Sequence, residues 1–191
     1  MTTALHRERL EAVVAEVLRD TPESVLDLGC GDGELMLRLA GTPGLSRLVG
    51  CDTCAGSLAR LRARLDGAEV RLASALEPPR DLAGFDCVAL VEVIEHLDPA
   101  HLSKLERALC VTLRPAKIVV TTPNAEFNPL LGVPAHRFRH PDHKFEWPRA
   151  KFRAWASRVA GAHGYAVTFA DLGGKHPSLG GASQMAVLRL N

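Results

Sequence analysis

The sequence predicts an α/β fold, in which a mostly parallel sheet of seven strands carries helices on both faces. Short apolar segments with the character of buried strands alternate along the chain with segments whose apolar residues recur at helical spacing. This alternation is typical of parallel sheets, because each crossover between parallel strands runs through a helix. Neither a repeat nor a shift in composition interrupts the pattern, so we expect residues 1–191 to form a single domain.

The composition excludes several classes of protein. The chain is 47% hydrophobic and 24% charged, as ordinary globular proteins are, and its net charge of +1 provides no overall attraction to nucleic acid or membranes. No apolar run reaches the roughly 18 residues of a membrane span. The N-terminus has no signal-peptide core, so we expect a cytoplasmic protein with reduced cysteines. Cys51 and Cys54 form a lone CxxC without the second pair that a zinc site needs.

Each expected element has its own signal in the sequence. The apolar segments predict strands over residues 23–28, 45–51, 68–73, 85–91, 117–121, 165–170 and 184–190. Apolar residues at helical spacing predict helices over residues 4–19, 35–40, 58–65, 99–109 and 148–159. Asp98 is the expected N-cap of the fourth helix, with Pro99 at its first position. Residues 122–146 show no periodicity, and loops of that length are usually functional or disordered.

A glycine-rich turn, DLGCGDG, follows the first expected strand at residues 27–33. Glycines there allow positive φ angles and close approach of a ligand to the backbone, and ligands of open α/β sheets bind beyond the carboxyl ends of the strands. The spacing disfavours a dinucleotide, because Glu34 stands where that fingerprint needs a small residue. The carboxylate two residues before the first glycine instead resembles motif I of S-adenosylmethionine (SAM)-dependent methyltransferases. That resemblance implies a Rossmann-like methyltransferase fold whose cofactor lies against Asp27, Gly29, Gly31 and Gly33.

Asp52 stands at the end of the second expected strand. An acid in that position can accept hydrogen bonds from both ribose hydroxyls of an adenosine. The alternative interpretation of these residues is a purely structural turn followed by an exposed acid. We favour SAM binding, because the turn, the acid and the order of the strands agree with one another.

Two carboxylates and an imidazole follow the buried strand at residues 85–91. If the chain turns helical there, Glu92 lies three residues before Glu95 and four before His96, so that all three share one face. When two carboxylates lie this near to each other, their repulsion raises the pKa of one of them, unless a cation lies between them. Three donors do not fill the shell of a divalent ion, so a fourth must come from elsewhere. The alternative is an ordinary helix start, where acids in the first turn are favoured by the helix dipole.

Three motifs in this order narrow the family. They are EVIEHL at residues 92–97, TPNAEFN at 122–128 and DHKFEW at 142–147. Together they closely resemble the Hen-type methyltransferases, which methylate the 2′-oxygen of the 3′-terminal nucleotide of small RNAs. QMAV at residues 184–187 is similar to the C-terminal strand of that family, so the resemblance covers nearly the whole chain.

The resemblance implies roles for particular residues. It makes Glu92, Glu95 and His96 catalytic metal ligands, with His143 as the missing donor, and it matches Asp52 and Ser74 to cofactor contacts. Two carboxylates and two imidazoles suit Mn²⁺, Co²⁺ or Fe²⁺ better than Mg²⁺, which remains possible. A divalent ion weakens the proton of a coordinated hydroxyl, and a ribose 2′-hydroxyl is otherwise a poor nucleophile. We therefore expect metal-dependent methyl transfer from SAM to the 2′-hydroxyl at an RNA 3′ end.

A local basic bias stands beside the expected metal residues. It consists of Arg137, Arg139, Lys144, Arg149, Lys151 and Arg153. These residues could bind phosphates, and Phe138 could stack on a base. His140 is interpreted as a support for His143 or as a phosphate contact. The alternative is a solvated face on a loop and a helix.

Two other functions remain open at this stage. A SAM-dependent methyltransferase acting on a small molecule or a protein would need no metal and would keep its activity in Glu95→Ala. A non-catalytic SAM-sensing or RNA-binding module would bind without turnover. Family members with known roles carry further regions, RNA-binding domains in plants and, in bacteria, an N-terminal region linked to an RNA-repair partner. This chain begins close to the methyltransferase domain, so the resemblance leaves a repair partner open.

Overall fold

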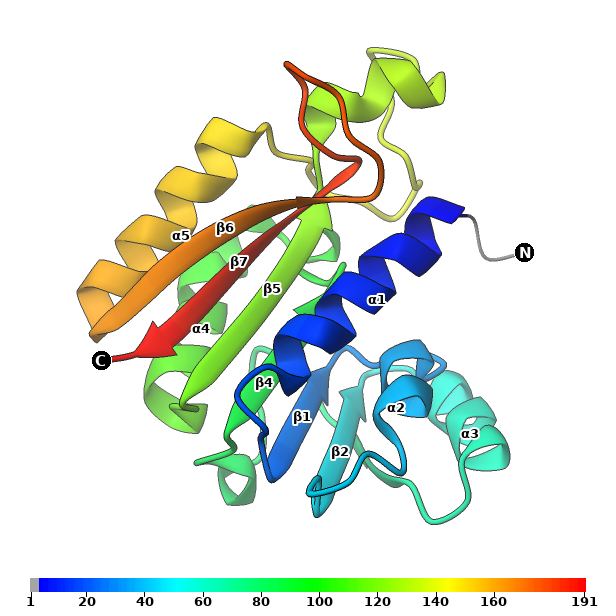
Figure 1. Cartoon of the computed structure of the whole chain (residues 1–191), viewed down its shortest axis with the longest axis vertical. Coiled ribbons are helices and arrows are strands. Elements are labelled where there is room, and N and C mark those ends of the chain that lie inside the picture. The colour runs from blue at the N-terminus through cyan, green and yellow to red at the C-terminus, as the bar shows by residue number, and fades with distance from the viewer. Residues whose placement is uncertain (1–3) are drawn as a thin grey trace.

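The computed structural model describes residues 4–191 and contains one sheet with helices on both faces (Figure 1). The order of the strands is β3-β2-β1-β4-β5-β7-β6. Their bounds are β1 Ser24–Leu28, β2 Arg47–Asp52, β3 Glu69–Leu72, β4 Cys87–Val91, β5 Lys117–Pro123, β6 Tyr165–Leu172 and β7 Ser183–Leu190. The pairs among β1 to β5 are parallel, whereas β7 is antiparallel to both β5 and β6. The predicted seven-stranded, mostly parallel sheet is confirmed.

Residues 4–191 also contain five α-helices and five segments of 3₁₀- or π-helix. The α-helices are α1 Ala4–Leu18, α2 Glu34–Leu39, α3 Ala55–Arg64, α4 Leu102–Arg107 and α5 Arg149–His163. The other helical segments are η1 Arg80–Leu82, η2 Ile94–His96, η3 Pro99–His101, η4 Ala108–Leu113 and η5 Ala125–Leu131. Asp98 caps η3 as predicted, because its Oδ1 accepts a hydrogen bond from the N–H of Ala100 at 2.8 Å. No helix in this part of the chain is long and apolar enough to cross a membrane.

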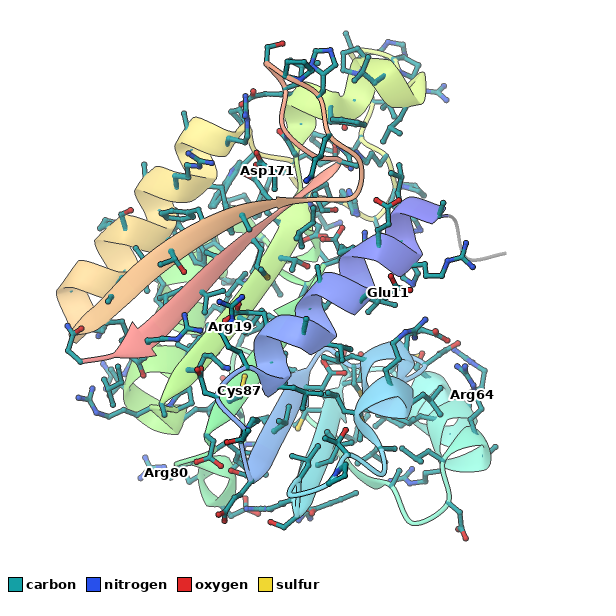
Figure 2. The ribbon with its side chains drawn as sticks, in the orientation of Figure 1. Glu11, Arg19, Arg64, Arg80, Cys87 and Asp171 are labelled. Atoms are coloured by element: carbon teal, nitrogen blue, oxygen red, sulfur yellow. The ribbon has the colours of Figure 1, made fainter. Side chains whose placement is uncertain are left out.

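The strands are apolar on both sides because each side faces a different layer of helices. Leu26 and Val88 pack into the cluster that contains residues of α4 and α5, whereas Val25 and Cys87 pack into the cluster formed with α1 and α2. Figure 2 shows Cys87 on β4 close to α1. Four of the five cysteines are buried and all are free thiols, so the CxxC forms no disulfide.

One prediction about the connections is wrong in part. Residues 122–146 are not one irregular loop, because β5 extends to Pro123 and η5 follows directly. Thr122 pairs with Gln184 of β7, which extends the strand. The side chain of Asn124 accepts a hydrogen bond from the N–H of Glu126 at 3.0 Å and so begins η5. This local capping and the pairing with a distant strand are not visible in the periodicity.

The sheet brings the sequence motifs to one edge. The glycine turn follows β1, Asp52 ends β2, Ser74 comes after β3 and Glu92 comes after β4. Because β1 to β4 run parallel, their carboxyl ends lie together, which is where open α/β sheets bind ligands.

Candidate active site

A cavity of about 590 Å³ lies at the carboxyl ends of the parallel strands. Its lining joins the two groups of residues that the sequence analysis treated separately. The predicted cofactor residues Gly29, Asp52 and Ser74 line it together with the predicted metal ligands Glu92 and His96. We call these two parts of the cavity the cofactor end and the metal end, after the ligands predicted for them.

The glycine turn at the cofactor end requires its glycines. Gly29, Gly31 and Gly33 have φ angles of +80°, +51° and +82°, which residues other than glycine rarely adopt. A Cβ on Gly29 would also lie 2.6 Å from Cγ2 of Val93, whereas a Cβ on Gly31 would meet nothing within 4 Å. Gly29 thus permits close packing of the protein on itself, and the open space is at Gly31.

Asp52 holds this turn in place. Its Oδ2 accepts a hydrogen bond from the N–H of Gly31 at 2.9 Å, and its Oδ1 accepts one from the N–H of Cys54 at 2.8 Å. Asp27 lies beneath the turn and is 2% exposed. Burial, together with the charge of Asp52, raises the pKa of Asp27 to about 7. A cationic ligand such as SAM would offset this paired negative charge, so the residues present fit that cofactor.

The metal end begins with a sharp bend at Glu92. The backbone of Glu92 is left-handed, with φ at +56°, and its N–H donates to the carbonyl oxygen of Thr121 at 3.2 Å. The short helix η2 begins only at Ile94, so the expected helix with Glu92, Glu95 and His96 on one face is wrong. The cause is that β4 remains paired with β5 as far as Val91, and the chain then leaves the sheet abruptly.

The carboxylate of Glu92 is surrounded by donors. Oε1 accepts a hydrogen bond from the hydroxyl of Thr121 at 3.0 Å, and Oε2 accepts one from the hydroxyl of Ser183 at 3.4 Å. Oε2 also lies 3.2 Å from Nη1 of Arg9 on α1. An arginine from the N-terminal helix therefore neutralises one of the two predicted carboxylate ligands.

Glu95 is in the opposite situation, because no described residue forms an ion pair with its carboxylate. Its side chain is fully buried, and only Oε2 is bonded, to the hydroxyl of Thr122 at 3.0 Å. Oε1 is buried without a hydrogen-bond partner among the described residues. Burial and the nearby charge of Glu92 raise the pKa of Glu95 well above its usual range. A buried carboxylate oxygen without a partner is rare in native proteins, and a cation would satisfy it.

Three imidazoles gather beside these carboxylates. His96, His140 and His143 each offer a ligand atom within 4.8 Å of the others, and the rings of His96 and His143 have centroids 4.8 Å apart. Burial and the two neighbouring histidines lower the pKa of His96, which favours the neutral form that binds metals. The structure brings the predicted pair His96 and His143 together and adds His140, but neither carboxylate belongs to this group.

The DHKFEW motif holds His143 in place through buried neighbours. Phe145 and Trp147 are buried and stacked, with ring centroids 4.5 Å apart. The N–H of Lys144 donates to the carbonyl oxygen of Glu95 at 2.7 Å, which fixes this segment to η2. Nδ1 of His143 lies 2.6 Å from Oε1 of the buried Glu146. The buried oxygen of Glu95 and the imidazoles of His96 and His143 are donors of the kind that bind divalent transition metals. The chemistry of these residues therefore fits such an ion.

The predicted basic surface is smaller than expected. Arg139 is half-buried and donates to Ala182 and Asn128, while Arg149 pairs with Glu126 at 2.8 Å. These two arginines are therefore structural. Arg137 and Lys144 remain exposed beside the imidazoles.

Sequence reasoning missed Arg9 and gave no role to Thr121 and Thr122. The two threonines carry a readable signal, because both are polar residues at the end of a fully buried strand. Arg9 carries none, since it is one of several charged residues on an amphipathic helix.

Comparisons with known proteins agree with this geometry. A family model described as a methyltransferase domain matches residues 25–116. The small RNA 2′-O-methyltransferase of Rattus norvegicus is 37% identical over 204 residues, covering 98% of this chain and 51% of the relative. The chain thus spans about half the length of the curated relatives it matches.

Two solved structures are similar over nearly the whole chain. The methyltransferase domain of a bacterial Hen1, CtHen1, has a TM-score of 0.86 and 32% identity, covering 97% of this chain and 100% of that one. The small RNA methyltransferase HEN1 has a TM-score of 0.89 and 31% identity, covering 98% of this chain and 25% of that one.

The sheet order, the glycine turn and the acid that ends β2 define a methyltransferase domain of the SAM-dependent class. Within that class, the chain belongs to the Hen1 family of small RNA 2′-O-methyltransferases.

Proposed function

We propose that this chain transfers the methyl group of SAM to the 2′-hydroxyl of the 3′-terminal nucleotide of RNA, and that it needs a divalent metal to do so. The observation that carries the proposal is the single cavity lined by both predicted cofactor residues and predicted metal ligands. Methyl transfer requires the acceptor oxygen in line with the sulfonium methyl, so donor and acceptor must share one cavity. The names of the relatives support an RNA 2′-hydroxyl as the acceptor.

The cofactor end would hold SAM through the backbone of the glycine turn and through Asp52. The open space at Gly31 admits the ligand close to the backbone. The carboxylate of Asp52, already fixed by two N–H groups, would accept hydrogen bonds from the ribose hydroxyls. Ser74 lines the same cavity and would add a hydroxyl contact.

The metal end would hold the ion with Glu92, Glu95, His96 and His143. This mixed set favours Mn²⁺ or Co²⁺, with Mg²⁺ possible. When bound, a divalent ion lowers the pKa of a hydroxyl and orients it. Thr122 fixes one oxygen of Glu95 and leaves the other free to bind. An imidazole that is not fully occupied as a ligand can accept the proton that the hydroxyl loses.

The RNA would approach over the segment next to the imidazoles. Residues 137–141 line a hollow of about 520 Å³, and Phe138 is 46% exposed there. An exposed aromatic ring can stack on a base, while Arg137 and Lys144 can contact phosphates. We propose this surface as the binding site for the last nucleotides of the RNA.

The direct experiment is methyl transfer from labelled SAM to a short RNA, with and without EDTA and added Mn²⁺. The same RNA blocked at its 3′ end and a DNA of the same sequence are the parallel substrates. We expect labelling only of the free-ended RNA and only with metal. Labelling that survives EDTA would contradict the metal requirement and favour a metal-independent methyltransferase. Labelling of the blocked RNA would contradict the proposed 3′-terminal acceptor.

A repair partner and a cytoplasmic location remain predictions. A chain of the solved Pnkp1/Rnl/Hen1 RNA repair complex has a TM-score of 0.72 with this chain, over 99% of this chain and 42% of that one. Their identity is 23%, so this likeness extends to the fold alone.

A further inference from the structure

His143 and His140 lie near His96 but make different hydrogen bonds. The side chain of His143 is 8% exposed, and its Nδ1 lies 2.6 Å from Oε1 of Glu146. The side chain of His140 is 54% exposed, and its Nδ1 accepts a hydrogen bond from the N–H of Asp142 at 3.2 Å. A neutral imidazole carries one proton, so the partner of Nδ1 decides whether Nε2 is a donor or a lone pair.

The polarity of the bond to His143 follows from a chain of buried hydrogen bonds that starts at Arg139. A guanidinium can only donate. Nε of Arg139 lies 2.5 Å from Oδ1 of Asn128, so that amide must present its oxygen to the arginine. Arg139 is itself held in place, because Nη1 donates to the carbonyl oxygen of Ala182 and Nη2 donates to that of Asn124.

The orientation of Asn128 then sets the role of Glu146. With its oxygen turned to Arg139, Asn128 presents Nδ2 to Oε2 of Glu146, and the two atoms are 2.6 Å apart. Oε1 of Glu146 also accepts a hydrogen bond from the N–H of Arg139 at 2.7 Å. The carboxylate of Glu146 is 1% exposed and acts as an acceptor on both oxygens. The remaining neighbour, Nδ1 of His143, must therefore be a donor.

We infer that Glu146 is a positioning residue that keeps the proton of His143 on Nδ1 and leaves Nε2 as a lone pair for the metal. The inference rests on the proposed metal site and deepens it. By the same reasoning, the proton of neutral His140 lies on Nε2, which makes that nitrogen a hydrogen-bond donor. Carboxylates that orient a ligating histidine typically contribute 10- to 100-fold to metal affinity.

The test combines a tautomer measurement with metal binding. Long-range ¹H–¹⁵N spectra of the metal-free protein, with His143 assigned by comparison with His143→Ala, should show His143 protonated on Nδ1 and His140 protonated on Nε2. Glu146→Gln keeps the side-chain volume but replaces one of the two acceptor oxygens by an NH₂ group, so the side chain can no longer accept hydrogen bonds from Asn128, Arg139 and His143 together. We expect this variant to bind Mn²⁺ about 10- to 100-fold more weakly, with an unchanged affinity for SAM.

Glu126→Gln is the matched control, because Glu126 is bonded to Arg149 instead of an imidazole. It should bind Mn²⁺ and SAM as the unmodified protein does, and thermal melts of both variants would show that they fold. If the spectra of the unmodified protein showed the proton of His143 on Nε2, that result alone would overturn the inference. Unchanged Mn²⁺ affinity in folded Glu146→Gln would also overturn it. If the unmodified protein bound no Mn²⁺ and methylated RNA in EDTA, the proposed metal site would fail, while the tautomer would still be measurable.

Discussion

The two ends of the cavity are built differently. At the cofactor end, a carboxylate binds and positions the backbone of the glycine turn. At the metal end, charged side chains form ion pairs with each other. Both oxygens of Asp52 are bonded to N–H groups of nearby turns. Glu92 instead depends on Arg9 of α1, and one buried oxygen of Glu95 has no hydrogen-bond partner in the part of the chain that the structure describes. Both oxygens of Asp52 are therefore bonded without a ligand, whereas one oxygen of Glu95 is not. Each prediction below tests whether this difference in construction is a difference in energetics.

The largest effect is expected for Glu95→Gln. This change removes a predicted ligand, so methyl transfer to RNA should fall on the order of 1000-fold, as is typical when a catalytic group is removed. The metal-free variant should nevertheless melt at the same temperature as the unmodified protein or higher, because a buried charge without a cation is costly. Activity assays and melts in EDTA measure the two effects. A large loss of stability in EDTA would show that Glu95 is a structural residue.

A pH effect of a few kcal/mol is expected from Asp27 at the cofactor end. Burial raises its pKa from 3.8 to about 7, so the folded protein keeps a proton that the unfolded chain has already lost. This contribution to stability is fully present below pH 4 and is lost as the pH rises through 7, and it amounts to roughly 4 kcal/mol. Asp27→Asn removes the titration, so the variant should be the more stable protein at pH 8 without SAM. The measurement is the melting temperature of both proteins from pH 4 to 8. A constant difference between the two temperatures over this range would contradict the prediction.

A smaller effect that separates the two ends is expected for Asp52→Ala. Loss of charged hydrogen bonds to the ribose should weaken SAM binding about 10- to 100-fold. The affinity for Mn²⁺ should remain unchanged, because Asp52 lies outside the imidazole group. Titration calorimetry with each ligand measures both. Weakened Mn²⁺ binding would mean that the two ends are coupled.

The same difference in construction explains what the sequence could predict. The fold and the cofactor end follow from local spacing, since the glycine turn and Asp52 each stand next to the strand that positions them. The metal end is assembled over long distances, with Glu92 bonded to Ser183 and Asn128 to Glu146. The resemblance of the motifs to a family implies which residues carry the chemistry there, and this stays a prediction. It could not predict the left-handed bend at Glu92, which depends on the pairing of β4 with β5.

The smallest effect concerns Arg9, for which no motif predicted a role. Its guanidinium neutralises Glu92 at 3.2 Å, and both side chains are less than one-fifth exposed. In Arg9→Gln, the metal-free protein should lose about 1 kcal/mol of stability, the scale of an ion pair that is partly shielded from solvent. The same change should tighten Mn²⁺ binding a few-fold, because a competing positive charge has been removed from a ligand.

Arg19, which directly follows α1, provides the control, since it pairs with Glu16 at 3.0 Å while its side chain is 66% exposed. Arg19→Gln should change neither the melting temperature in EDTA nor the affinity for Mn²⁺. If Arg9→Gln weakens Mn²⁺ binding instead, Arg9 organises Glu92 for the metal and does not compete with it. The metal end would then be preorganised in the same way as the cofactor end.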